Sequence, residues 1–192
     1  MINRISNYIA DKLILNSIIS KQDKNVYKYG LETLIVIGFN ILSVFIIGYI
    51  FGMLVECIVF LIVLIPLRSF AGGYHTSNYT KCFIFSFFVL GVAIESIKLG
   101  VLRYHHIILI LLVFSCVIIW LFAPLPDANK EMSNEELTKN KFKTKVILGL
   151  ECLIFIATWQ YNKGMAYFIA CAIITTGVSF GLYFIKRKLI AG

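Results

Sequence analysis

Long uninterrupted runs of apolar residues are the feature that most limits how this chain can fold. Several runs reach the roughly 18 to 20 residues that an α-helix needs to cross a bilayer. Of the 192 residues, 59% are hydrophobic and 15% are charged, which is far more apolar than soluble domains are. A soluble fold of this length could not bury that much apolar surface. We therefore predict an all-α, polytopic membrane protein.

One amphipathic helix and six transmembrane helices account for the chain as a single membrane domain, residues 1–192. Apolar residues recur at helical spacing from Ile2 to Leu13 with polar residues opposite them, which predicts an interfacial helix over residues 2–20. This start lacks the pattern of a cleaved secretory signal, so we expect no cleavage there. The predicted membrane spans are residues 31–49, 52–67, 80–97, 104–122, 145–161 and 164–185.

The positions of the basic residues predict the orientation. Three of the 18 Lys and Arg residues, Lys98, Arg103 and Lys163, fall on one side of the predicted membrane. The other fifteen fall on the opposite side: Arg4, Lys12, Lys21, Lys24, Lys28, Arg68, Lys81, Lys130, Lys139, Lys141, Lys143, Lys145, Lys186, Arg187 and Lys188. By the positive-inside rule that side is the cytoplasm, so both termini should be cytoplasmic. The positions of the charges thus matter more than the net charge of +8. The expected partner is the lipid bilayer, and no nucleic-acid partner is expected.

The remaining motifs indicate packing more than chemistry. Five cysteines form no CxxC pair and have no histidine at ligand spacing, which argues against a disulfide framework, a metal site or a cofactor. Two GxxxG motifs permit close helix approach. The motif at Gly48–Gly52 indicates a tight turn, and the motif at Gly177–Gly181 indicates helix packing or a homodimer. Residues 124–140 are predicted to be a solvated connection.

The segment from Pro66 to Cys82 is the part of the sequence that suggests catalysis. It reads Pro-Leu-Arg-Ser-Phe-Ala-Gly-Gly-Tyr-His-Thr-Ser-Asn-Tyr-Thr-Lys-Cys and interrupts two apolar spans. Polar groups at a membrane boundary are costly unless they are used. A cysteine nucleophile needs a base, because a free thiol with a pKa of about 8.5 is mostly protonated near neutrality. His75 and Cys82 are the obvious pair.

The spacing of this pair limits the local structure. Seven residues along a straight helix would separate His75 and Cys82 by about 10.5 Å, too far for direct proton transfer. The pair can meet if a helix begins after His75, with Ser77 or Asn78 as N-cap and with Gly72 and Gly73 as a hinge. Cys82 would then lie near the helix N-terminus, where the helix dipole and Lys81 lower the thiol pKa. The alternative is a buried Cys82 that only packs and an interfacial His75.

The pattern Arg68-x4-Gly73-x-His75-x6-Cys82 between two spans resembles the AgrB family, accessory gene regulator protein B. The resemblance implies a cysteine endopeptidase of the bacterial cell membrane, with Cys82 as nucleophile and His75 as base. It also implies that Arg68 and Gly73 support activity. The implied partner is an AgrD-type precursor peptide, which is cleaved through a thioester on Cys82 and cyclised to a thiolactone or lactone signal for quorum sensing.

Other interpretations of the same residues stay open. Glu32, at the cytoplasmic end of the first predicted span, could orient His75 or could serve only as an interfacial carboxylate. The whole chain could instead be a small six-span transporter or exporter, since buried polar residues can line a path across the membrane. A membrane scaffold that binds a peptide without cleaving it is a third interpretation. Removing the Cys82 thiol distinguishes these two interpretations from the enzyme, because only the enzyme needs the thiol for its activity.

Overall fold

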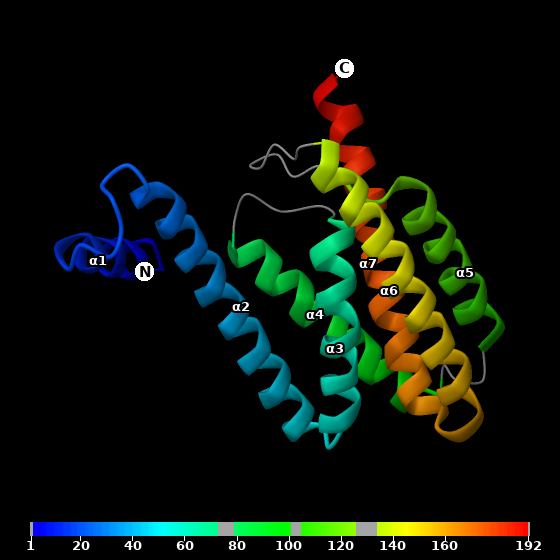
Figure 1. Cartoon of the computed structure of the whole chain (residues 1–192). Helices are drawn as coiled ribbons and strands as arrows, with labels where there is room; N and C mark the ends of the chain where they lie inside the picture. The colour runs from blue at the N-terminus through cyan, green and yellow to red at the C-terminus, as the bar shows by residue number, and fades with distance from the viewer. Residues whose placement is uncertain (1, 73–78, 101–104, 126–133, 192) are drawn as a thin grey trace. The chain divides into compact units, whose positions relative to one another are not determined.

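The computed structural model of the chain describes residues 2–72, 79–100, 105–125 and 134–191, and for residues 33, 79–87, 98 and 186–191 it describes the backbone alone. The described residues contain no strand, so the predicted all-α class is confirmed for them. Figure 1 shows the helices α1 (Ile2–Leu15), α2 (Lys24–Ile50), α3 (Leu54–Ala71), α4 (Tyr79–Lys98), α5 (His105–Phe122), α6 (Asn134–Tyr161) and α7 (Lys163–Ala191). They form two compact units, Met1–Ser43 and Val44–Gly192.

The first unit contains α1 and most of α2, joined by polar contacts. The Ser6 hydroxyl, which is fully buried, donates a hydrogen bond of 3.1 Å to Oε1 of Glu32. The ammonium group of Lys24, at the start of α2, forms an ion pair with the carboxylate of Asp11, with Nζ and Oδ1 2.5 Å apart. Helix α1 ends earlier than the predicted residue 20, because Ser17 has a φ of 56°, a conformation that a helix interior does not accommodate.

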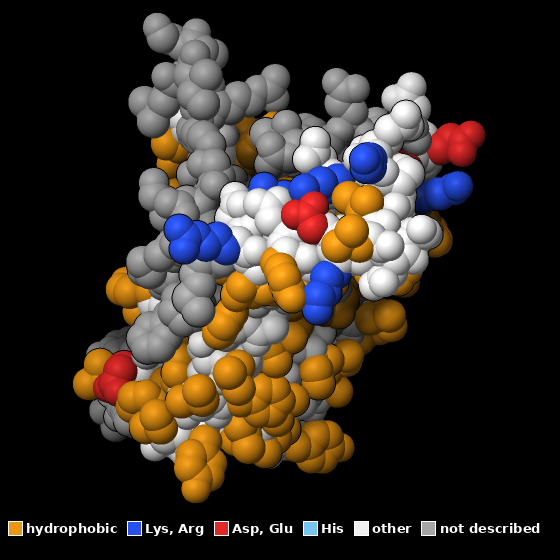
Figure 2. Space-filling model, turned by 90° about the vertical axis from the view of Figure 1, so that its left-hand side faces the viewer, with side chains coloured by type: hydrophobic (Ala, Val, Ile, Leu, Met, Phe, Trp, Pro, Cys, Tyr) orange, Lys and Arg blue, Asp and Glu red, His pale blue; other side chains and the backbone are white. Residues whose placement is uncertain are grey.

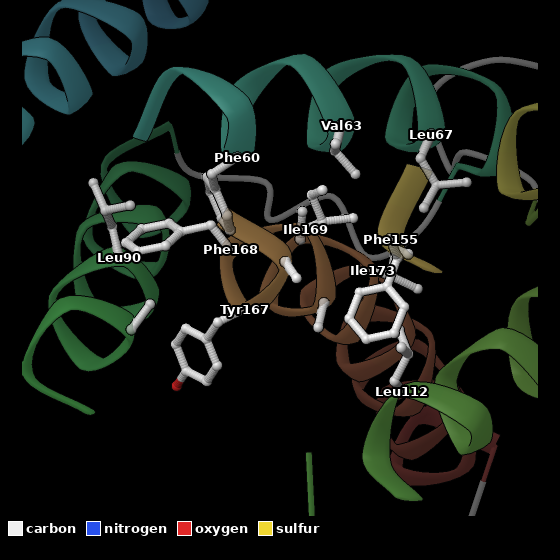
Figure 3. Packing of buried hydrophobic residues seen from close by; sticks show 14 of the residues in the cluster. Phe60, Val63, Leu67, Leu90, Leu112, Phe155, Tyr167, Phe168, Ile169 and Ile173 are labelled. Atoms are coloured by element: carbon white, nitrogen blue, oxygen red, sulfur yellow. The ribbon is translucent and has the colours of Figure 1, made fainter. Parts of the chain in front are cut away.

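In the second unit α7 is the central helix, and it packs against α3, α4, α5 and α6. Figure 3 shows side chains from all five helices meeting in one hydrophobic cluster. The largest fully buried side chains include Phe60 from α3, Leu90 from α4 and Phe168 from α7. This core places the C-terminal end of α3 and the N-terminal ends of α4 and α6 at the same end of the unit (Figure 1).

The way α5 is buried indicates what surrounds the protein. Its buried residues recur every three or four positions, as expected for one face of a helix: Ile108, Leu112, Ser115 and Ile119. The opposite faces are equally apolar, and Ile110, Val113 and Phe114 are 61 to 67% exposed. A helix that is apolar all round but packed on one stripe needs an apolar medium on its other faces. That medium is the lipid bilayer.

Within the part of the chain that the structure describes, four helices are long and apolar enough to cross a membrane: Lys24–Ile50, Leu54–Ala71, His105–Phe122 and Lys163–Ile185. They correspond to four of the six predicted spans. The other two predicted spans coincide with α4 and the second half of α6, and these stay predictions. In α4, where side chains are described only from Phe88 on, the apolar stretch Phe88–Ile97 is shorter than a membrane span. On the face shown in Figure 2, Lys and Arg side chains gather in one band and the area below it is mostly hydrophobic.

Helix α6 corrects one sequence prediction. Residues 124–140 were expected to be a connection, but α6 begins at Asn134. Glu135 and Glu136 in the first turn interact favourably with the positive end of the helix dipole. Glu135 also forms a long ion pair with Lys139, one turn later, at 3.8 Å. The charges that suggest a solvated loop therefore stabilise the start of a solvated helix.

The first GxxxG motif forms the predicted tight turn. The amide of Met53 donates to the carbonyl of Gly48 at 2.8 Å, and Gly52 has a φ of 68°. A Cβ on Gly48 would lie 3.0 Å from Cα of Leu54 and 3.1 Å from Cβ of Cys57. The missing side chain at Gly48 therefore lets α3 fold back directly against the end of α2.

The second GxxxG motif packs helices within the chain. A Cβ on Gly177 of α7 would lie 2.6 Å from both Cβ and Oγ of Ser115 on α5, whereas nothing lies within 4 Å of a Cβ on Gly181. We expect Gly177→Ala to reduce stability by about 1–3 kcal/mol, as overpacking of a core does. Thermal unfolding in detergent measures this. Gly181→Ala, one turn later, is the matched control and should leave the midpoint unchanged; equal losses in both variants would contradict the predicted contact.

Candidate active site

Helix α3 ends at Ala71, within the predicted catalytic region, and the part of that region after Gly72, residues 73–82, is the catalytic segment. Arg68 lies in the last turn of α3 and is half-buried, and its carbonyl accepts a hydrogen bond from the amide of Gly72 at 3.1 Å. Gly72 ends the helix with a φ of 72°, in the left-handed region that glycine adopts most readily. Of the supporting residues, Arg68 is thus placed at the base of the segment, whereas Gly73 lies outside the described residues.

The segment ends at the start of α4. This helix begins at Tyr79, so the backbone of Cys82 lies in its first turn. A helix start at this position agrees with the one that the pairing of Cys82 with His75 requires. The side chain of Cys82 and all of His75 lie outside the described residues. The pairing of the two therefore stays a prediction.

A second element contacts the end of α3. The chain leaving α5 brings the amide of Leu125 within 2.9 Å of the carbonyl of Ala71, to which it donates a hydrogen bond. Leu125 is 5% exposed and Ala71 is fully buried. Phe70, the residue before Ala71, is also in contact: the ammonium group of Lys143 on α6 lies 4.9 Å from the centre of its ring. The residues directly before the catalytic segment are thus held by two neighbouring parts of the chain.

Glu32 has a partner in the first unit. Its Oε1 accepts the hydrogen bond from Ser6 on α1 described above, which ties the carboxylate to the N-terminal helix. Anchoring α1 is therefore one role of this residue. Whether Glu32 also orients His75 stays a prediction, because His75 lies outside the described residues.

Two features of the second unit were not predicted from the sequence. The thiols of Cys116 on α5 and Cys152 on α6 lie 3.7 Å apart, although 36 positions separate them. Next to Cys152, the carboxylate of Glu151 is 5% exposed, and its Oε2 has no hydrogen-bond partner among the described residues. Among these same residues, no group of three His, Cys, Asp or Glu side chains could hold a metal ion.

Together these features define the class of protein as a helical membrane protein in which the candidate catalytic residues lie between the end of α3 and the first turn of α4 along the chain. The family model for Accessory gene regulator B, AgrB, matches residues 2–185. The chain therefore belongs to the AgrB family.

Two relatives from Clostridium perfringens are similar over most of the chain. AgrB-like protein 2 of strain 13 (type A) is 27% identical over 174 residues, which cover 85% of this chain and 81% of that protein. The AgrB-like protein of strain SM101 (type A) is 28% identical over 175 residues, with the same two coverages. Both names record a likeness to AgrB and not a measured activity. No solved structure matches the chain.

Proposed function

We propose that this protein is a membrane-embedded cysteine endopeptidase that cleaves an AgrD-type propeptide and promotes its cyclisation to a peptide signal for quorum sensing. The observation that carries the proposal is the family match over residues 2–185, a range that includes the pattern Gly73-x-His75-x6-Cys82. The start of α4 at Tyr79 supports it, because the backbone of Cys82 then lies at a helix N-terminus. Exposed amides there favour a thiolate.

The first half of the reaction forms an acyl-enzyme. His75 accepts the proton of the Cys82 thiol, and the thiolate attacks the carbonyl carbon of the scissile peptide bond. The tetrahedral intermediate collapses as His75 gives its proton to the departing amide nitrogen. The C-terminal part of the precursor leaves as a free amine, and the N-terminal part stays attached to Cys82 as a thioester.

The second half closes the ring. A cysteine within the bound peptide attacks the thioester carbonyl, His75 takes up its proton, and the thiolate of Cys82 leaves and is reprotonated. One thioester bond forms as another breaks, so no external energy source is needed. Attack by water would release a linear acid instead, so the acyl-enzyme must be kept dry. A site at the membrane boundary helps to exclude water.

Co-expression with an AgrD-type precursor tests the proposal. We expect two products by mass measurement, namely the released C-terminal fragment and a peptide one water lighter than the corresponding linear acid. The precursor expressed alone is the control and should remain intact. An intact precursor in the presence of this protein would contradict the proposed activity.

The proposed orientation places both termini, and the end of the second unit where α3 ends, in the cytoplasm. Helix α6 allows a paired test, because Thr138 near its start and Tyr161 at its end are both exposed. We expect Tyr161→Cys to react with a membrane-impermeant maleimide in intact cells, and Thr138→Cys to react only after permeabilisation. Site-specific mass measurement distinguishes these thiols from the native ones. The reverse pattern would invert the orientation, and labelling of both in intact cells would show that α6 does not cross the membrane.

A further inference from the structure

The contact between Gly72 and Leu125 limits what residue 72 can be. A Cβ on Gly72 would lie 2.5 Å from the carbonyl oxygen of Leu125 and 3.3 Å from its amide nitrogen. Ordinary contacts between carbon and oxygen begin at about 3.3 Å, so one of the two backbones would have to move by roughly 0.8 Å. The φ of 72° adds a second reason for glycine.

The described residues offer two comparisons. Gly52 and Gly100 also have positive φ values, of 68° and 73°, but nothing lies within 4 Å of a Cβ on either. All three residues have a positive φ, so a side chain would strain the backbone at each of them. The collision is specific to Gly72, since it alone of the three meets another segment of backbone.

The end of α3 is therefore fixed in place from outside the helix. Leu125 holds Ala71 by a backbone hydrogen bond and abuts Gly72, and Lys143 lies over the ring of Phe70. Three consecutive residues are thus held by the segment after α5 and by α6. His75 follows Gly72 by three positions, so the Cα atoms of the two residues can be no more than about 11 Å apart. A restraint at Gly72 limits where the imidazole can lie.

We propose that Gly72 and Leu125 are positioning residues that fix the start of the catalytic segment, so that His75 meets the Cys82 thiol. This inference rests on the proposed function. It assigns to Leu125, in the segment that follows α5, a role in catalysis, although its position in the sequence suggests only a solvated linker. It also makes Gly72 a fixed point at the start of the segment and not part of a flexible hinge.

The test compares Gly72→Ala with Gly52→Ala. A displacement of about 1 Å can lower a rate about 10²-fold, so we expect Gly72→Ala to cleave the precursor roughly 10- to 100-fold more slowly. The pH at which Cys82 is alkylated, followed by the mass of its peptide, should rise toward that of His75→Ala. Gly52→Ala should match the wild type in both measurements. General loss of stability would not move the alkylation pH of the folded protein.

A second pair of variants keeps the test decisive if Gly72→Ala does not fold. Leu125→Pro removes the amide that bonds to Ala71, whereas Leu125→Ala keeps it. We expect the proline variant to raise the alkylation pH of Cys82 and the alanine variant to raise it less. Combining Gly72→Ala with His75→Ala should give no further rise beyond His75→Ala alone.

Different results would overturn different claims. If His75→Ala raises the alkylation pH but Gly72→Ala and Leu125→Pro do not, the positioning role is wrong and the proposed enzyme stands. An equal effect of Gly52→Ala would also overturn the positioning role, because strain alone would then account for it. If His75→Ala itself changes nothing, the pairing of His75 with Cys82 is wrong, and the inference drawn from it is wrong as well.

Discussion

Replacing Cys82 by alanine is expected to abolish processing of the precursor. Without the thiol there is no nucleophile to form the thioester, and removal of the nucleophile from a hydrolase lowers the rate by several orders of magnitude. We expect a loss of at least about 10³-fold in the appearance of both products, measured by mass after co-expression. Cys82→Ser should be nearly as inactive, because its hydroxyl is far less acidic than a thiol.

Cys57→Ala is the matched control for the loss of Cys82. Cys57 is fully buried near the start of α3, at the opposite end of that helix from the catalytic segment. Its replacement should cost some stability but leave processing intact. A transporter or a peptide-binding scaffold needs no thiol. Cleavage that survives in Cys82→Ala, with the protein inserted in the membrane, would therefore favour one of those interpretations.

Replacing His75 by glutamine should lower cleavage by about 10²- to 10⁴-fold, the usual contribution of a general base. The same change should raise the pH at which Cys82 reacts with an alkylating reagent, toward the value near 8.5 of an unperturbed thiol. Glutamine keeps the polarity of the side chain but cannot accept the proton. The two measurements together separate loss of the base from loss of folding.

His105→Gln serves as the control for His75. His105 begins α5, at the end of the second unit opposite to the end of α3 (Figure 1), and its ring lies 6.3 Å from that of Trp159. Its replacement should change neither cleavage nor the reactivity of Cys82. An alkylation profile that stays the same in His75→Gln would rule out direct pairing, even if cleavage were lost.

The helices could be predicted because each depends on residues close together in the sequence. Apolar runs of sufficient length identified the regions that became α2, α3, α5 and α7. The turn at Gly52 follows from local glycine chemistry in the same way. Helix α6 was predicted to begin too late, because Glu135 and Lys139 are as suitable for a solvated helix as for a loop. Composition alone does not separate these two.

Contacts between distant residues could not be predicted in this way. Gly177 lies opposite Ser115, and Gly72 opposite Leu125, only because α3, α5 and α7 pack together as they do. Neither pair has a sequence spacing that indicates contact. The catalytic residues are a different case. The chemistry of a thiol and an imidazole, together with the family pattern, suggests their roles, but it does not fix the distance between them.

The thioester on Cys82 is the central claim, and its direct detection is the most direct test. A precursor whose ring-forming cysteine is replaced by alanine cannot displace Cys82, so the acyl-enzyme should persist until water attacks it. After rapid denaturation at low pH, the peptide containing Cys82 should carry the mass of the N-terminal precursor fragment, and hydroxylamine should remove that mass. Cleavage of the precursor with no such adduct on Cys82 would contradict the account.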